Sequence, residues 1–163
     1  MSRIGLIAGN GRFPLFFADS ARQEGNKVIA VAFREETSPD LEGLVEQIHW
    51  FHVGELQAVI DTFLKAGINR IVMAGKITKT HMFNHLKPDA RLKKVFEKTP
   101  IHTDDALLKT LAAEFISEGI HVCDSTTFLS SLLPQKGCLT TRLPSDEEMQ
   151  DIKYGYEIAK TIG

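Results

Sequence analysis

The start of the chain constrains the fold more than any other segment. Residues 4–8 are apolar, and a glycine turn separates them from Pro14, which suits a first helical turn because its missing amide proton has no partner there. A strand that feeds through such a turn into a helix leaves backbone N–H groups unpaired beneath the positive end of the helix dipole. The opening therefore predicts an α/β protein with an anion-binding turn, formed by Gly9, Asn10, Gly11, Arg12 and Phe13.

This turn departs from the dinucleotide-binding fingerprint in two ways. That pattern has a third glycine where the helix packs on the strand, and an acidic residue about 20 residues later that binds the ribose. Here Pro14 takes the third position, and the second apolar run ends at Arg34, with Glu35 after it. Gly-x-Gly turns also occur for structural reasons alone, so a phosphate contact and a purely structural turn both stay open.

Apolar runs alternate with amphipathic helical patterns along the chain. We predict strands at residues 4–8, 28–33, 47–53, 70–74 and 121–123. We predict helices at residues 14–24, 55–66, 90–96, 104–117 and 145–161, and a short helix or turn at residues 126–132. Ser145 and Glu148 form a capping box at the start of the last helix. The alternation is typical of a Rossmann-like three-layer α/β domain, with a mostly parallel sheet of about five strands.

The carboxyl ends of parallel strands meet at one edge of a sheet, and ligands bind there. Four loops are therefore expected to come together, namely residues 9–13, 34–37, 75–80 and 124–126. In the third loop Gly75 lets the backbone approach a ligand, and Lys76 either binds a phosphate or is a solvated lysine. In the last loop Asp124, Ser125 and Thr126 either hydrogen-bond a ligand or cap the next helix.

Charged residues between the fourth and fifth strands have more than one interpretation each. Asp104 and Asp105 open a helix, where capping is a simpler role for a carboxylate than holding a cation or a sugar hydroxyl. Residues 76–98 contain seven Lys and Arg against two acids, which suits an anionic substrate, an anionic lipid surface or a solvated helix. His81 and His85 have the spacing of helical metal ligands, but a nearby proline and the lack of a flanking Glu argue against a metal pair.

The composition is that of one globular domain of ordinary size. The chain has 163 residues, 43% hydrophobic and 25% charged, and its net charge of −2 gives no field that attracts nucleic acid. Cys123 and Cys138 are too few for a disulfide scaffold, so we expect reduced thiols in a cytoplasmic protein. We recognise no signal peptide and no membrane-spanning stretch, so a membrane contact would be peripheral.

Five segments together resemble a known family: residues 4–14, 72–75, 104–108, 124–126 and 144–148. Over nearly its whole length the chain is similar to the LpxI-type UDP-2,3-diacylglucosamine pyrophosphatases of lipid A biosynthesis. The resemblance implies a magnesium-dependent hydrolase of two domains, in which water attacks the α-phosphorus of UDP-2,3-diacylglucosamine and releases UMP and lipid X. It also implies that residues 1–163 are the Rossmann-like amino-terminal domain, and that the carboxy-terminal catalytic domain is absent from this chain.

On this interpretation, the glycine turn and Lys76 neutralise part of the substrate's phosphate charge, while the catalytic residues and metal ligands stay unassigned. The alternative is a nicotinamide- or nucleotide-sugar-binding Rossmann module without hydrolase activity. Because the implied substrate carries two acyl chains, peripheral contact of the basic segment with the inner membrane surface is consistent with the resemblance. A homodimer is left open.

Overall fold

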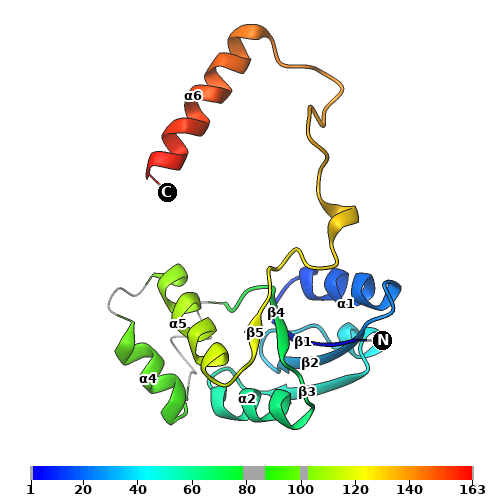
Figure 1. Ribbon diagram of the computed structural model, residues 1–163, viewed down its shortest axis with the longest axis vertical. Coiled ribbons are helices and arrows are strands. Elements are labelled where there is room, and N and C mark those ends of the chain that lie inside the picture. The colour runs from blue at the N-terminus through cyan, green and yellow to red at the C-terminus, as the bar shows by residue number, and fades with distance from the viewer. Residues whose placement is uncertain (1, 79–86, 100–102, 163) are drawn as a thin grey trace. The chain divides into compact units, whose positions relative to one another are not determined.

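The computed structural model describes residues 2–78, 87–99 and 103–162 (Figure 1). The chain divides into two compact units, Met1–Ser131 and Leu132–Gly163. The single domain expected over residues 1–163 stays a prediction. The first unit contains the sheet, and the second contains one long helix. We describe each unit by itself.

The first unit is built on a five-stranded sheet in which every strand pairing is parallel. Its strands are β1 (Arg3–Ala8), β2 (Lys27–Phe33), β3 (Gln47–Phe51), β4 (Arg70–Ala74) and β5 (His121–Val122). The strand order is β3-β2-β1-β4-β5. In a sheet of this order the direction of winding reverses between β1 and β4, and the carboxyl ends of these two strands flank the expected ligand crevice.

Helices cover both faces of this sheet (Figure 1). They are α1 (Phe13–Gln23), η1 (Pro39–Leu44), α2 (Leu56–Lys65), α4 (Ala90–Lys98) and α5 (Asp104–Ser117). In β2, Ile29 and Val31 are buried in the core that contains α2, α4 and α5, whereas Ala30 is buried in the core that contains α1. Successive side chains of a strand point to opposite faces, so a strand covered on both sides is apolar throughout. The predicted three-layer α/β class is confirmed.

Most element ends lie within two residues of the predicted ones, and two differences have local causes. The third strand was expected to reach residue 53 but ends at Phe51, because the chain turns through Gly54, whose φ of +119° favours glycine. The stretch around Ser38, expected to be a loop, begins the 3-10 helix η1. The Ser38 side chain caps it by accepting a hydrogen bond from the Asp40 amide at 3.3 Å.

The second unit consists of an extended segment followed by α6 (Asp146–Ile162). The predicted capping box at its start is confirmed: the Ser145 amide donates to Glu148 at 2.8 Å, and the Glu148 amide donates to the Ser145 hydroxyl at 3.2 Å. Arg142 also forms two hydrogen bonds with the Glu148 carboxylate, of 2.9 and 3.0 Å. Among the described helices, none has the length and apolar character needed to cross a membrane.

Candidate functional site

The ends of β1 and β4 are joined to each other at the carboxyl edge of the sheet. The Gly9 amide donates to the carbonyl of Ala74 at 2.8 Å, and Asn10 and Lys76 exchange two backbone hydrogen bonds of 2.7 and 3.1 Å. We call Gly9, Asn10, Gly75 and Lys76 the β1–β4 seam. Because the amides of Gly9 and Asn10 are both paired, the expectation of free N–H groups at these two residues is wrong.

The close approach of the two chains explains both glycines of the seam. A Cβ atom on Gly9 would lie 2.5 Å from the carbonyl oxygen of Lys76, and a Cβ atom on Gly75 would lie 2.7 Å from the carbonyl oxygen of Asn10. Gly75 also has a φ of +87°, which side chains rarely adopt. These two glycines therefore serve backbone packing, which is the structural interpretation that the sequence had left open.

The next three residues form the start of α1 and keep their amides available. Among the residues that the structure describes, no acceptor pairs with the amides of Gly11, Arg12 or Phe13. No side chain caps α1, and its first turn contains no acidic residue. Gly11 has a φ of +101° and open space where a Cβ atom would be. Free amides at the positive end of a helix favour an anion, so only residues 11–13 of the predicted anion-binding turn have the free amides that the prediction requires.

The loop after β2 packs against the turn after β1. The hydroxyl of the buried Thr37 donates to the carbonyl of Ala8 at 2.5 Å and accepts from the Phe33 amide at 2.9 Å. The Asn10 side chain donates to the Glu36 carbonyl at 3.1 Å. The two loops are therefore hydrogen-bonded to each other at the sheet edge, as their positions after neighbouring parallel strands predicted.

The Glu36 side chain connects the same loop to the segment that follows β4. Only 5% of Glu36 is exposed, and its carboxylate accepts from the Thr78 amide at 2.7 Å and from the Thr78 hydroxyl at 2.8 Å. A buried carboxylate needs such donors because burial without them is costly. The sequence placed residues 34–37 and 75–80 at this edge but gave no signal for this pair, since the two residues are far apart in the chain.

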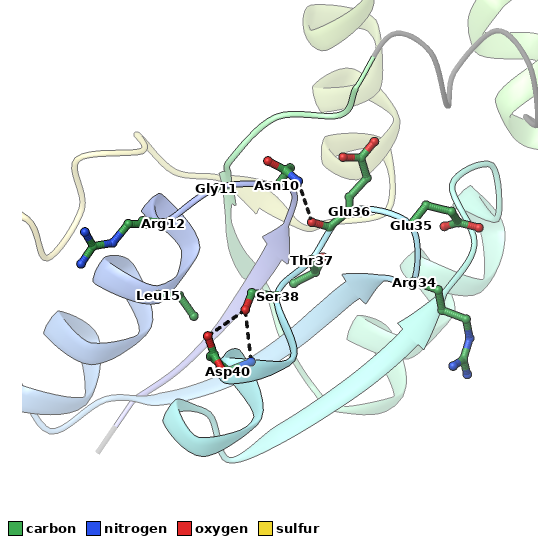
Figure 2. A pocket seen from close by; sticks show the side chains of 10 residues that line it. All are labelled: Asn10, Gly11, Arg12, Leu15, Arg34, Glu35, Glu36, Thr37, Ser38 and Asp40. Atoms are coloured by element: carbon green, nitrogen blue, oxygen red, sulfur yellow. Dashed lines mark hydrogen bonds between the residues drawn. The ribbon is translucent and has the colours of Figure 1, made fainter.

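A pocket of about 550 Å³ opens between the start of α1 and the loop after β2 (Figure 2). It is lined by Asn10, Gly11, Arg12, Leu15, Arg34, Glu35, Glu36, Thr37, Ser38 and Asp40. In Figure 2 the side chains of Arg12 and Arg34 extend outward on opposite sides, while Ser38 and Asp40 face each other below the turn. We call this cavity the edge pocket. Of residues 11–13, Gly11 and Arg12 line this open space, and Phe13 does not.

The acidic side chains of the edge pocket have partners of their own. Burial raises the pKa of Glu35, but hydrogen bonds from His52 and from the backbone outweigh this effect and leave the pKa below its ordinary value. Asp40 accepts from the Ser38 hydroxyl at 3.0 Å. Arg12 lies over the Phe16 ring, with 5.1 Å to the centroid. No carboxylate pairs with either guanidinium of the pocket within the described part of the chain, so both charges are available to a ligand.

The two acidic residues predicted at the start of α5 lie outside the edge pocket. Thr103 caps the helix by accepting from the Ala106 amide at 3.3 Å, so the expected carboxylate cap is wrong. Asp105 forms an ion pair with Lys109 at 2.6 Å, and Asp104 lies in the first helical turn. Their acidic charge at a helix start still favours the helix through its dipole.

The Asp-Ser-Thr sequence after β5 forms a local turn. Asp124 accepts from the Thr126 amide at 2.7 Å and from the Thr126 hydroxyl at 2.5 Å. The Thr126 hydroxyl and then its amide lower the pKa of Asp124. Ser125 is exposed, and the short helix or turn predicted over residues 126–132 consists of a turn followed by η2 (Ser130–Leu132). None of these residues lines the edge pocket.

Part of the predicted basic segment is used to hold α4 on α5. Arg91 pairs with Glu114 at 3.0 Å and with Glu118 at 2.7 Å, and Lys98 pairs with Glu114 at 2.8 Å. The predictions for Lys79, His81 and His85 lie outside the described residues. Within residues 2–78, 87–99 and 103–162, no three His, Cys, Asp or Glu side chains come together in a way that would hold a metal ion.

The strand order, the strand–turn–helix opening and the edge pocket define a Rossmann-like α/β domain with a candidate anion site. The family described as "LpxI N-terminal domain" matches residues 3–132, and the chain belongs to this family, as the sequence segments had indicated. The UDP-2,3-diacylglucosamine pyrophosphatase LpxI of Caulobacter vibrioides is 27% identical over 166 residues, which cover 100% of this chain and 58% of that protein. The chain thus spans less than two thirds of this curated relative.

Solved structures give a weaker likeness. The biotin carboxylase domain of the Hydrogenobacter thermophilus 2-oxoglutarate carboxylase is 13% identical, covers 73% of this chain and 22% of that chain, and has a TM-score of 0.44. The biotin carboxylase subunit of a pyruvate carboxylase is 16% identical, covers 71% of this chain and 33% of that chain, and has a TM-score of 0.39. Neither likeness is close enough to support an argument about function.

Proposed function

We propose that this chain is the amino-terminal, substrate-binding part of an enzyme that hydrolyses the pyrophosphate of UDP-2,3-diacylglucosamine to UMP and lipid X. Membership of the LpxI N-terminal family and the name of the Caulobacter relative support the reaction. The observation that carries the binding role is the uncapped start of α1, where the amides of residues 11–13 are free and where Gly11 and Arg12 line the edge pocket. Such a helix start suits the phosphates of a nucleoside diphosphate sugar.

In the proposed reaction, the carboxyl edge of the sheet neutralises the charge of the substrate's phosphates and holds them in position. Phosphoryl transfer spreads negative charge over the phosphate oxygens, and fixed donors that face those oxygens lower the barrier. The amides of residues 11–13 supply fixed donors, and the unpaired guanidinium of Arg12 and the exposed ammonium of Lys76 supply charge. The groups that act on the attacking water stay unassigned.

The β1–β4 seam favours a UDP-sugar over a nicotinamide dinucleotide. A dinucleotide lies across the carboxyl ends of the strands on both sides of β1. In this chain Asn10 and Lys76 join the loops on the β4 side, so the edge pocket opens on the β2 side. The acid that would bind the ribose is also lacking, because Arg34 follows the end of β2 and Glu35 is paired with His52.

Two further features of the proposal are supported by the family resemblance alone. We propose that hydrolysis depends on Mg²⁺, with ligands other than the described residues, because those residues form no metal-binding group. We also propose a peripheral contact with the inner membrane surface, made by the exposed lysines Lys87, Lys93 and Lys94, since the substrate carries two acyl chains. Cytoplasmic location and a homodimer stay predictions.

Binding of UDP to the chain, followed by amide NMR, tests the binding role. We expect the largest shifts at residues 11–13, and the variant Gly11→Val to weaken binding at least about tenfold, because a side chain at this φ distorts the turn. Gly25→Val is the matched control, since Gly25 also has a positive φ, +76°, and open surroundings, but lies in the turn after α1. Equal UDP affinity of Gly11→Val and the unaltered chain would contradict the binding role.

The hydrolysis is tested separately. The chain, joined to the part of the Caulobacter relative that it does not match, is assayed for UMP release from UDP-2,3-diacylglucosamine with and without Mg²⁺. We expect release only with Mg²⁺, and slower release with the Gly11→Val substitution than with Gly25→Val. A folded fusion that binds UDP but releases no UMP would exclude the proposed reaction while leaving the binding role intact.

A further inference from the structure

We propose that Glu36 is a positioning residue that fixes Lys76 beside the anion-binding turn. This inference rests on the proposed function, because it concerns how the phosphate site is held in shape. Glu36 lies in the loop after β2, and Lys76 lies in the segment after β4. The two residues are connected through Asn10 on one side and Thr78 on the other.

The first connection runs through the backbone of Glu36. Its carbonyl accepts from the Asn10 side chain at 3.1 Å, and the Asn10 backbone pairs with Lys76 through two hydrogen bonds of 2.7 and 3.1 Å. Asn10 immediately precedes Gly11, the first residue with a free amide. The loop after β2, the glycine turn and Lys76 are therefore linked by consecutive hydrogen bonds.

The second connection runs through the carboxylate of Glu36, which points away from Ser38 and Asp40 in Figure 2. It accepts from the amide and the hydroxyl of Thr78 at 2.7 and 2.8 Å. Charged acceptors form stronger hydrogen bonds than neutral ones, and only 5% of Glu36 is exposed to competing water. The backbone from residue 76 to residue 78 is thus held at both ends, by Asn10 and by Glu36.

This arrangement holds the backbone of Lys76 in place, while its side chain stays exposed to solvent. A flexible lysine loses less freedom on binding a phosphate when its backbone is already immobile. Glu36 lines the edge pocket, but its carboxylate is held by the amide and hydroxyl of Thr78, so it acts on the ligand through Lys76. A residue that only stabilised the fold would affect binding equally whether or not Lys76 was present.

A double-mutant cycle on UDP affinity distinguishes these two roles. We expect Glu36→Ala and Lys76→Ala each to weaken binding about tenfold, and the double variant to lose little more than either single variant, because one group acts through the other. Glu36→Gln keeps the shape and one acceptor, so it should recover part of the affinity. Additive losses, a hundredfold in the double variant, would overturn the proposal.

Glu46 supplies the matched control at the opposite edge of the sheet, where its carboxylate pairs with Lys27 at 2.8 Å and Arg3 at 3.4 Å. Glu46→Ala should leave UDP affinity unchanged, alone and with Lys76→Ala. Hydrogen exchange of the Thr78 amide gives a readout that needs no ligand: Glu36→Ala should accelerate it and Glu46→Ala should not. An unaltered chain that fails to bind UDP contradicts the proposed function, whereas unchanged Thr78 exchange in Glu36→Ala contradicts the anchor.

Discussion

The carbonyl oxygen of Lys76 lies 2.5 Å from the position that a Cβ atom on Gly9 would occupy. Folded proteins do not tolerate a carbon–oxygen distance this short, and here both partners belong to backbone that is hydrogen-bonded on either side. The contact therefore cannot be relieved by turning a flexible side chain. It couples the end of β1 to the end of β4, and hence the shape of the candidate site to the stability of the sheet.

Gly9→Ala should consequently destabilise the first unit. Forcing a methyl group into such a contact displaces backbone, and we expect a loss of about 2 kcal/mol in the free energy of unfolding. Urea unfolding followed by circular dichroism measures this loss. Gly43→Ala is the control, because no atom lies within 4 Å of its added methyl group, and its stability should stay within about 0.5 kcal/mol of the unaltered chain. Equal stabilities of the two variants would show that the backbone of the β1–β4 seam shifts at little cost and accommodates the methyl group.

Local sequence patterns predicted the elements that depend on local interactions. The bounds of α5 and β4 agree with the prediction at every end, since helical spacing of leucines marks the former and a run of apolar residues bounded by Arg70 and Gly75 marks the latter. The capping box at Ser145 was also predicted, because its two residues lie three positions apart. These features require no knowledge of distant parts of the chain.

The site was predicted in outline only. Strand order gathers the loops at one edge by a general rule of parallel sheets, so residues 9–13 and 34–37 were expected together. The pairing of Asn10 with Lys76 and the bonds from Glu36 to Thr78 depend on how two distant segments meet, and neither residue type nor spacing encodes that. The sequence also does not distinguish a glycine with a free amide, such as Gly11, from a glycine required by close backbone packing, such as Gly9.

The carboxylate of Glu114 should make the stability of the first unit depend on pH. The hydrogen bond from Lys98 lowers the pKa of Glu114, and Arg91 lowers it further, despite the opposing effect of burial. A carboxyl group with a lowered pKa in the folded state stabilises it above the ordinary value of about 4.5, and this contribution is lost as the pH falls through the folded pKa. We expect Glu114→Gln to lower the free energy of unfolding by about 1 kcal/mol at neutral pH. The free energy of unfolding of this variant should also fall less steeply than that of the unaltered chain as the pH is lowered.

Urea unfolding at a series of pH values measures this dependence. Glu24→Gln is the control, because Glu24 is an exposed residue at the end of α1. As the pH is lowered, Glu24→Gln should lose the same free energy of unfolding as the unaltered chain. If Glu114→Gln and the unaltered chain lose stability in parallel below the ordinary carboxyl pKa, then the ion pairs between α4 and α5 do not contribute.

Removing the hydroxyl of Ser145 should loosen the start of α6. The Glu148 amide would lose its acceptor, and capping groups of this kind contribute about 1 kcal/mol to helix stability. Circular dichroism and Cα chemical shifts should show fraying of the first turn in Ser145→Ala. Thr161→Ala is the control, because its hydroxyl bonds back to Glu157 inside the last turn and caps nothing. Unchanged shifts around residues 146–149 would argue against the capping role.

Cys138 should react with alkylating reagents faster than Cys123. Hydrogen bonding with the Thr140 side chain and then with its backbone lowers the pKa of Cys138, with a sulfur-to-hydroxyl distance of 3.3 Å. Cys138 is also exposed, whereas Cys123 is half-buried against the core. Because the thiolate is the reactive form, a lowered pKa raises the reactive fraction at neutral pH. Alkylation by iodoacetamide, followed by mass spectrometry of the Cys138 peptide over a series of pH values, should give a midpoint below the ordinary pKa of a thiol. Thr140→Val should raise that midpoint and Thr127→Val should not; a midpoint unaffected by Thr140→Val would assign the reactivity of Cys138 to exposure alone.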